Sequence, residues 1–172
     1  MNSDETQAYL REHPWFREPY EAAKQLERDI PELTLRPGLS DAEREKLDER
    51  IPRGDPPYCW DNTYSTPKTY LDFLKLVGGF EFDRLHLSGE SIGVYSSATK
   101  SRSGPTMGHM ITYQVRYPVK LRLGHCDHGD YLFDTRWNNY ILVNHDRTVY
   151  FDDCIGMLLH AMWRLRENWE GR

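Results

Sequence analysis

Cysteine is scarce in this sequence. The three cysteines, Cys59, Cys126 and Cys154, are odd in number and lie far apart. This spacing matches neither a disulfide framework nor the paired cysteines of a zinc knuckle. We therefore expect reduced, partly buried thiols, which are usual in proteins of a reducing compartment.

Long apolar runs are also missing. No stretch approaches the roughly 18 consecutive apolar residues that a membrane-spanning helix needs. Residues 1–5 have neither the basic flank nor the apolar run of a secretion signal. These two absences predict a soluble cytoplasmic protein with no membrane partner.

The chain has no excess of positive charge. Its net charge is −5. Residues 1–55 hold 9 Lys/Arg and 14 Asp/Glu, whereas residues 56–172 hold 13 of each, so the whole acidic excess lies in the first third. An acidic chain without a basic tail is poorly suited to general nucleic-acid binding, and we expect no nucleic-acid partner.

The 172 residues suit one globular unit, in which two regions differ in composition. Residues 1–55 are predicted to be an acidic helical segment, with Pro14 separating a short helix from one over residues 16–29. Ser40 and Glu43 form a capping box, which predicts a mostly solvated helix over residues 41–50. A linker rich in Pro and Gly follows, and residues 56–172 are predicted to be a core that folds without the first segment.

The core begins with a clear helix signal. Thr66 is suited to the cap and Pro67 to the first turn, and the following apolar residues recur at helical spacing until Gly78 and Gly79, which are predicted to end the helix. Short strands are expected over 80–87, 91–97, 130–135, 139–144 and 148–151, and a final helix is expected to start near residues 152–153.

The strongest strand signal lies over residues 111–123. Apolar side chains occupy the odd positions and polar ones most even positions, which predicts one buried and one solvated face, with an interruption at Pro118. Strands joined by tight turns and flanked by helices predict an α+β fold. We expect a mostly antiparallel sheet of about five or six strands, with an extra helical segment at the N-terminus.

The order of these motifs is similar to that of the SUKH superfamily. An amphipathic helix leads to Gly78 and Gly79, a Gly-Asp-Tyr-Leu-Phe-Asp strand follows over residues 129–134, and an amphipathic helix closes the chain. The resemblance covers about residues 57–165. It implies a protein-binding module without enzymatic activity or cofactor, most often an immunity protein that neutralises a toxin. A viral branch of such proteins, thought to counter host defences, gives a further alternative.

Residues 125–130 hold the densest group of chemically active side chains. His125, His128 and Asp130 are all possible metal ligands, which gives the alternative of a small metal-dependent hydrolase. The other interpretation is a polar turn between two strands, shaped by Gly129 and Asp130. A nucleophilic pair of Cys126 or Cys59 with His145 is a third possibility, although no glycine-rich oxyanion turn accompanies either cysteine.

Cations on the solvated face of the 111–123 strand are the leading candidates for partner binding. The alternative is an ordinary solvated sheet face. Cations fixed on a sheet are expected to hold an acidic partner, whereas Glu43, Glu45 and Glu49 of the acidic segment are expected to accelerate association with a basic one. The predicted partner-binding residues are Arg116, Lys120, Arg122, Lys100, Arg102 and Trp137.

Overall fold

The computed structural model describes residues 1–50, 67–89, 92–95, 120–135, 137–144 and 147–172. In this part of the chain, helices flank one antiparallel sheet of eight strands, so the α+β class is confirmed and the strand count exceeds the expected five or six. The helices are α1 (Ser3–Glu12), the 3-10 turn η1 (Pro14–Phe16), α2 (Arg17–Asp29), α3 (Asp41–Arg50), α4 (Lys68–Phe73) and α6 (Cys154–Glu170). The strands are β1 (Thr34–Pro37), β2 (Val77–Phe82), β3 (Leu85–Ser88), β4 (Gly93–Tyr95), β5 (Lys120–Cys126), β6 (Gly129–Asp134), β7 (Asn139–Val143) and β8 (Thr148–Phe151).

The strands follow one another across the sheet nearly in chain order, β1-β2-β3-β5-β6-β7-β8. β3 and β4 both pair with β5, β3 at residues 124–125 and β4 at residues 120–122. The pairs β2-β3, β5-β6, β6-β7 and β7-β8 are antiparallel neighbours in the chain, so they need no crossover. β1 and β8 are the outer strands of the described sheet.

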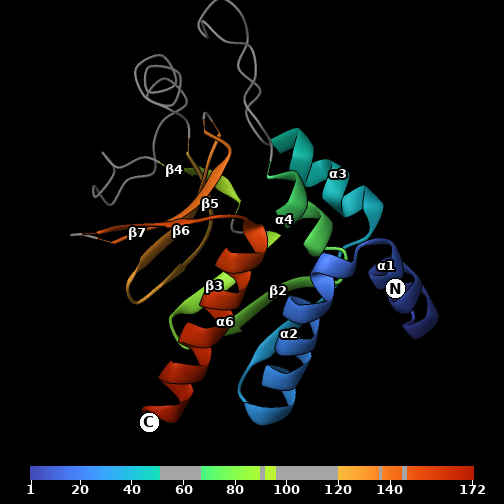
Figure 1. The fold of residues 1–172 in the computed structure, drawn as a ribbon, viewed down its shortest axis with the longest axis horizontal. Coiled ribbons are helices and arrows are strands. Elements are labelled where there is room, and N and C mark those ends of the chain that lie inside the picture. The colour runs from blue at the N-terminus through green and yellow to red at the C-terminus, as the bar shows by residue number, and fades with distance from the viewer. Residues whose placement is uncertain (51–66, 90–91, 96–119, 136, 145–146) are drawn as a thin grey trace, which may run out of the picture.

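Helices α2 and α6 lie side by side over one face of the sheet (Figure 1). Arg166 of α6 forms an ion pair with Asp29 of α2, with 3.1 Å between Nη2 and Oδ2. As predicted, α6 begins after an acidic residue, because the Asp153 carboxylate accepts a hydrogen bond from the Gly156 N–H. None of the described helices is both long enough and apolar enough to cross a membrane.

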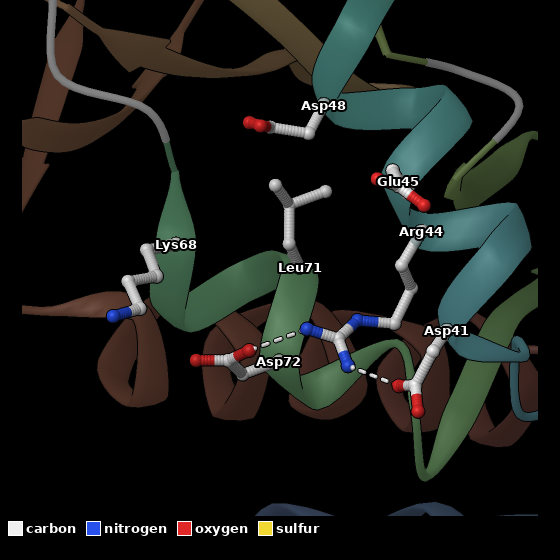
Figure 2. Close-up of a pocket in the computed structure, with 7 residues that line it drawn as sticks. All are labelled: Asp41, Arg44, Glu45, Asp48, Lys68, Leu71 and Asp72. Atoms are coloured by element: carbon white, nitrogen blue, oxygen red, sulfur yellow. Dashed lines mark hydrogen bonds and ion pairs between the residues drawn. The ribbon is translucent and has the colours of Figure 1, made fainter.

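Helix α3 has the predicted bounds and the predicted capping box. The Ser40 N–H donates to Glu43 Oε2 at 2.8 Å, and the Glu43 N–H donates to Ser40 Oγ at 3.3 Å. The helix is less solvated than expected, since Leu47 is buried. Arg44 also reaches α4, where its Nη2 lies 2.7 Å from Asp72 Oδ1 (Figure 2). The sequence alone showed the cap but not these contacts.

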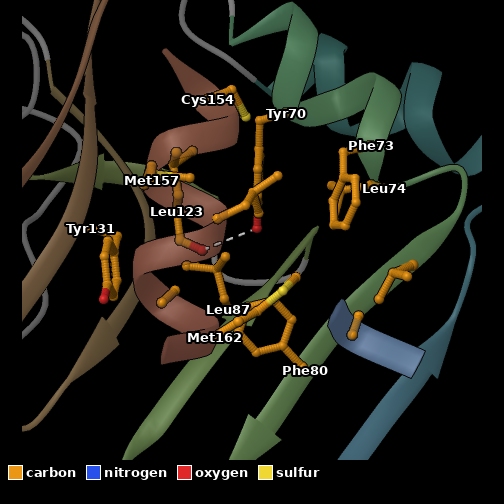
Figure 3. Close-up of a cluster of buried hydrophobic side chains, with 14 of the residues drawn as sticks. Tyr70, Phe73, Leu74, Phe80, Leu87, Leu123, Tyr131, Cys154, Met157 and Met162 are labelled. Carbon is orange, nitrogen blue, oxygen red and sulfur yellow. Dashed lines mark hydrogen bonds between the residues drawn. The ribbon is translucent and has the colours of Figure 1, made fainter. Parts of the chain in front are cut away.

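One hydrophobic core joins the helices to the sheet (Figure 3). Tyr70 of α4 is fully buried in it, and its hydroxyl lies 3.5 Å from the Leu123 carbonyl oxygen. Burial raises the pKa of Tyr70 well above its usual value, so the phenol stays protonated. The N-terminal segment supplies a large part of this core, namely Leu10, Phe16, Ala23, Leu26, Ile30, Leu33 and Leu47.

The glycine pair has a different role from the predicted one. Helix α4 ends at Phe73, and Gly78 and Gly79 lie inside β2. A Cβ atom on Gly78 would lie 2.2 Å from the Pro37 carbonyl oxygen, and one on Gly79 would lie 2.5 Å from that of Leu87. Gly79 also has a φ of +149°. Both glycines therefore allow β1 and β3 to approach β2 closely, and they do not end the helix.

Two strand predictions also need correction. Residues 80–87 form parts of two strands, β2 and β3, joined by a turn at Asp83 and Arg84, and Asp83 adopts a φ of +54°. Aspartate tolerates this left-handed conformation better than most residues, so the turn needs no glycine. The N-terminal segment is also not wholly helical, because β1 pairs with β2. Most of the alternating run at 111–123 lies outside the described residues.

Candidate functional site

A row of polar side chains crosses four neighbouring strands. Glu81 of β2 pairs with His86 of β3, His86 pairs with His125 of β5, and His125 pairs with Asp130 of β6. Directly opposed residues of antiparallel strands point to the same face. The alternate residues of β2 and β3 are in the hydrophobic core, so this polar row lies on the face turned away from α2 and α6.

A β-bulge brings His125 into the polar row. Leu121 and Leu123 are fully buried, and unbroken alternation would point residue 125 into the core as well. The register shifts between Arg122 and Gly124, so the extra residue reverses the alternation. His125 therefore shares a face with Arg122, which the sequence pattern did not predict.

The groups of the row are paired with one another. Arg122 Nη2 lies 2.6 Å from Asp130 Oδ1, and His86 Nδ1 lies 3.5 Å from Glu81 Oε2. The rings of His86 and His125 stack, with centroids 5.7 Å apart and planes 6° apart. Burial is the main cause that lowers the pKa of His125, aided by Arg122 and His86 and opposed by Asp130 and Glu81. The neutral imidazole is therefore favoured at this position.

We expect His125 to make the folded state less stable as the pH falls below neutral. Because folding lowers its pKa, the unfolded chain binds this proton more readily. The stabilisation is complete above the unfolded pKa of about 6.5 and is lost as the pH falls from there through the lowered pKa. Thermal melts of the wild type and His125→Gln at neutral and mildly acidic pH should show a smaller pH dependence in the variant.

His128→Gln is the control for this experiment, since His128 lies in an exposed turn. It should keep the wild-type pH dependence. Part of the pH dependence should remain in His125→Gln, because burial also lowers the pKa of His160. Identical pH dependence in His125→Gln and the wild type would contradict the assignment.

The predicted basic face is only partly described. Lys120 is half-buried, and Arg122 is 44% exposed but forms an ion pair with Asp130. Arg116, Lys100 and Arg102 lie outside the described residues. The described part of this face therefore alternates in charge, and its role in partner binding stays a prediction. Trp137 is 64% exposed in the turn between β6 and β7, where a partner could reach it.

The three possible metal ligands do not form one cluster, although His125 and Asp130 are opposed on β5 and β6. His128 lies in the turn after β5, His125 stacks on His86, and Asp130 pairs with Arg122. No group of three or more His, Cys, Asp or Glu side chains within the described ranges is placed to hold a metal ion. A turn at Asp127 and His128 joins β5 to β6, and Asp130 lies in β6 beyond it. Gly129 has a φ of +141°, and a Cβ there would lie 2.1 Å from the Val143 carbonyl oxygen.

The cysteine chemistry considered from the sequence is disfavoured at Cys126. This thiol is buried, and burial raises its pKa above the usual value. The thiolate, which is the nucleophile, is therefore rare at neutral pH. The other members of the suggested pair, Cys59 and His145, lie outside the described residues. His160 is half-buried at the edge of the core, where its Nδ1 forms a hydrogen bond of 3.0 Å with the Tyr131 hydroxyl.

A hollow open to solvent lies between α3 and α4 (Figure 2). It has a volume of about 410 Å³. Its walls are one face of each helix, because the residues recur at steps of three and four positions. It is lined by Asp41, Arg44, Glu45, Asp48, Lys68, Leu71 and Asp72. We call it the α3–α4 pocket.

The charges of the α3–α4 pocket are mostly negative and partly fixed in place. Four carboxylates and two cations line it. Arg44 bridges the two helices, with Nη1 3.1 Å from Asp41 Oδ1 and Nη2 2.7 Å from Asp72 Oδ1. Lys75 Nζ lies 3.0 Å from Asp41 Oδ1, and this contact is the main cause that lowers the pKa of Asp41. Two carboxylates are therefore held in a defined position.

Tyr9 of α1 contacts two residues that hold the pocket together, Asp72 and Lys75. Its hydroxyl donates to the Asp72 carbonyl oxygen at 3.2 Å, and Lys75 Nζ lies 5.3 Å from the centre of its ring. Burial, followed by the charge of Asp72, raises the pKa of Tyr9 to about 12. The Arg44 Nε is buried and has no hydrogen-bond partner. Contacts from α1, α3 and α4 with the residues after it thus hold Asp41, Arg44 and Asp72 in place.

Sequence reasoning missed the α3–α4 pocket. The four residues of α3 that line it are spaced as i, i+3, i+4 and i+7, which marks one helix face, but only the packing of α3 on α4 makes that face concave. No family model matches the chain, and no curated protein or solved structure matches it either.

Proposed function

We propose that this chain is a non-enzymatic cytoplasmic protein-binding module that inhibits a basic partner protein, in the manner of an immunity protein. The observation that carries the proposal is the α3–α4 pocket, where fixed carboxylates line a hollow open to solvent. The motif order that resembles the SUKH superfamily supports the inhibitory role. The acidic excess of residues 1–55 supports the choice of a basic partner.

The pocket suits an arginine or lysine side chain of the partner. A carboxylate that is already held by neighbouring cations loses little conformational freedom when a ligand binds. Asp41 and Asp72 are held in this way by Arg44 and Lys75. Glu45 is exposed at the rim, where its charge can steer a basic partner to the pocket. Charge-assisted hydrogen bonds to a guanidinium group would then fix the orientation of the complex.

Reversing charge at the pocket is expected to weaken binding of a basic ligand. An oligo-arginine peptide is the probe, and amide chemical shifts of the full-length protein report where it binds. We expect shifts at residues 41–48 and 68–72. The double variant Glu45→Lys, Asp48→Lys should lower the affinity at least about tenfold, which corresponds to about 1.4 kcal/mol.

The matched control is Glu18→Lys, Glu21→Lys, which makes the same charge change at exposed positions of α2. It should lower the affinity much less. An equal loss in both double variants would mean that net charge alone attracts the peptide, and the pocket would have no specific role. High salt should reduce the association rate in every variant.

The predicted sheet face is tested with a protein partner. The product of the neighbouring gene is the first candidate, because genes for immunity proteins lie next to those of their toxins. If that protein binds the full-length chain, Arg122→Glu raises the dissociation rate only when the sheet face contacts it. If the pocket variant blocks binding and Arg122→Glu leaves the dissociation rate unchanged, the interface lies on α3 and α4.

A further inference from the structure

Strand β8 lies at the outer edge of the described sheet, and three of its four side chains are exposed. Val149 is 41% exposed and Tyr150 is 70% exposed, although both are large hydrophobic residues. In the part of the chain that the structure describes, no strand pairs with the outer edge of β8. Edge strands commonly carry a lysine, a proline or a bulge that prevents further pairing, and β8 has none of these. Its outer edge is therefore suited to another strand.

The register with β7 determines which backbone groups of β8 point outward. The Asn144 N–H donates to the Arg147 carbonyl oxygen at 2.8 Å, so these residues form a hydrogen-bonded pair beside the turn. Hydrogen-bonded pairs alternate with non-bonded pairs along an antiparallel ladder. Val149 and Phe151 therefore bond to β7, whereas the N–H and C=O groups of Thr148 and Tyr150 point to the outer edge.

We propose that two copies of this chain form a dimer by antiparallel pairing of their β8 strands, with Tyr150 on the twofold axis. A twofold axis perpendicular to the sheet places Tyr150 opposite Tyr150 of the second copy, on the face of the polar row. The same register places Val149 opposite Phe151 of the second copy, on the helix face. The outward backbone groups of Tyr150 then bond to one another across the axis.

The charges at the ends of β8 complement each other in this register. Arg147 precedes β8 and Asp153 follows it, and both are exposed. Antiparallel pairing about Tyr150 places Arg147 opposite Asp153 of the second copy, twice in each dimer. Asp153 Oδ1 accepts the Gly156 N–H, which orients the carboxylate. The strand is thus complementary to itself in backbone, apolar contacts and charge.

Helix α6 extends the proposed contact on the helix face. The Phe151 ring lies 5.2 Å from that of His160, which lies 5.8 Å from that of Trp163. Trp163 is 52% exposed and therefore adds apolar surface beside Val149 and Phe151. Pairing of β8 with β1 of another copy is less suitable, because Pro37 of β1 has no N–H to donate.

Sedimentation equilibrium of the full-length protein should show a dimer that dissociates on dilution. Tyr150→Lys should raise the dissociation constant at least about tenfold, because two like charges would then face each other across the axis. Trp15→Lys is the control, since Trp15 is 53% exposed and lies on η1. It should leave the dissociation constant unchanged. Circular dichroism confirms that both variants are folded.

Disulfide cross-linking tests the register in a Cys59→Ser background. Tyr150→Cys places two thiols together across the axis and should give a covalent dimer under mild oxidation. Val149→Cys lies opposite Phe151 and should cross-link far less. A monomer at all concentrations, oligomers larger than a dimer, or equal cross-linking of both cysteine variants would each overturn the proposal.

Discussion

Removal of residues 1–50 is expected to abolish cooperative folding of the remaining chain. The composition of the linker after residue 50 led to the opposite expectation, that residues 56–172 fold alone. The structure changes this expectation, because the first 50 residues supply seven side chains of the common core and one strand of the sheet. Linker composition describes only the connection and not the contacts that cross it.

The size of the lost contribution decides the outcome. Phe16 and Ile30 are each 1% exposed, and Leu10, Leu26, Leu33 and Leu47 are also buried. Burial of one such side chain contributes about 1.5–3 kcal/mol. Six of them together match the whole stability of a typical domain, about 5–15 kcal/mol. The truncated chain would also expose β2 as a new edge strand, which favours aggregation.

Denaturant unfolding followed by circular dichroism measures this effect. The full chain should unfold in one cooperative transition, and the chain that starts at residue 51 should show no such transition. Deletion of residues 1–8 is the control, because Leu10 is the buried residue of α1 and is retained. A soluble truncated protein with a sharp transition would show that residues 51–172 are an independent core.

Gly124→Ala is expected to cost about 3 kcal/mol of folding free energy. A Cβ atom at this position would lie 2.3 Å from the His86 carbonyl oxygen and 2.4 Å from Leu87 Cδ1. The first of these atoms is backbone, so β3 would have to move away from β5. The bulge that brings His125 to the polar row begins at the same place, and it should be disturbed with the strand.

Gly156→Ala provides the matched control for this prediction. The nearest atom to a Cβ on Gly156 is Asp153 Oδ1 at 3.6 Å, an ordinary contact. Because Gly156 lies within α6, alanine there should stabilise the helix by up to about 1 kcal/mol. The melting temperature should fall by roughly 6–12 °C for Gly124→Ala and rise slightly for Gly156→Ala. Equal melting temperatures would show that β3 moves freely.

Features that depend on neighbouring residues could be predicted from the sequence. The capping box set the start of α3 at Asp41, and Asp153 set the start of α6, because an N-cap interacts with groups only three positions away. The bounds of β8 followed from its β-branched and aromatic residues. In each case the deciding contact lies within a few residues of the signal.

Features that depend on distant partners could not be predicted. Gly78 and Gly79 resemble a helix end, and only the approach of β1 and β3 reveals their role. The alternation of apolar and polar residues up to Leu123 does not reveal the bulge between Arg122 and Gly124. The α3–α4 pocket needs the packing of two helices, and its bridging pair, Arg44 and Asp72, is 28 positions apart in the chain. Local patterns carry no information on such contacts.

The pairing of α2 with α6 also has a consequence for protein synthesis. Asp29 and Arg166 are separated by 137 positions, so α2 leaves the ribosome long before the helix beside it exists. Translation at about 5–20 residues per second leaves a gap of about 7–27 seconds. During this interval the side of α2 that packs on α6 has no native cover, whereas β5 to β8 can pair as each is made. Chaperone binding to the nascent chain would therefore be concentrated on its first thirty residues.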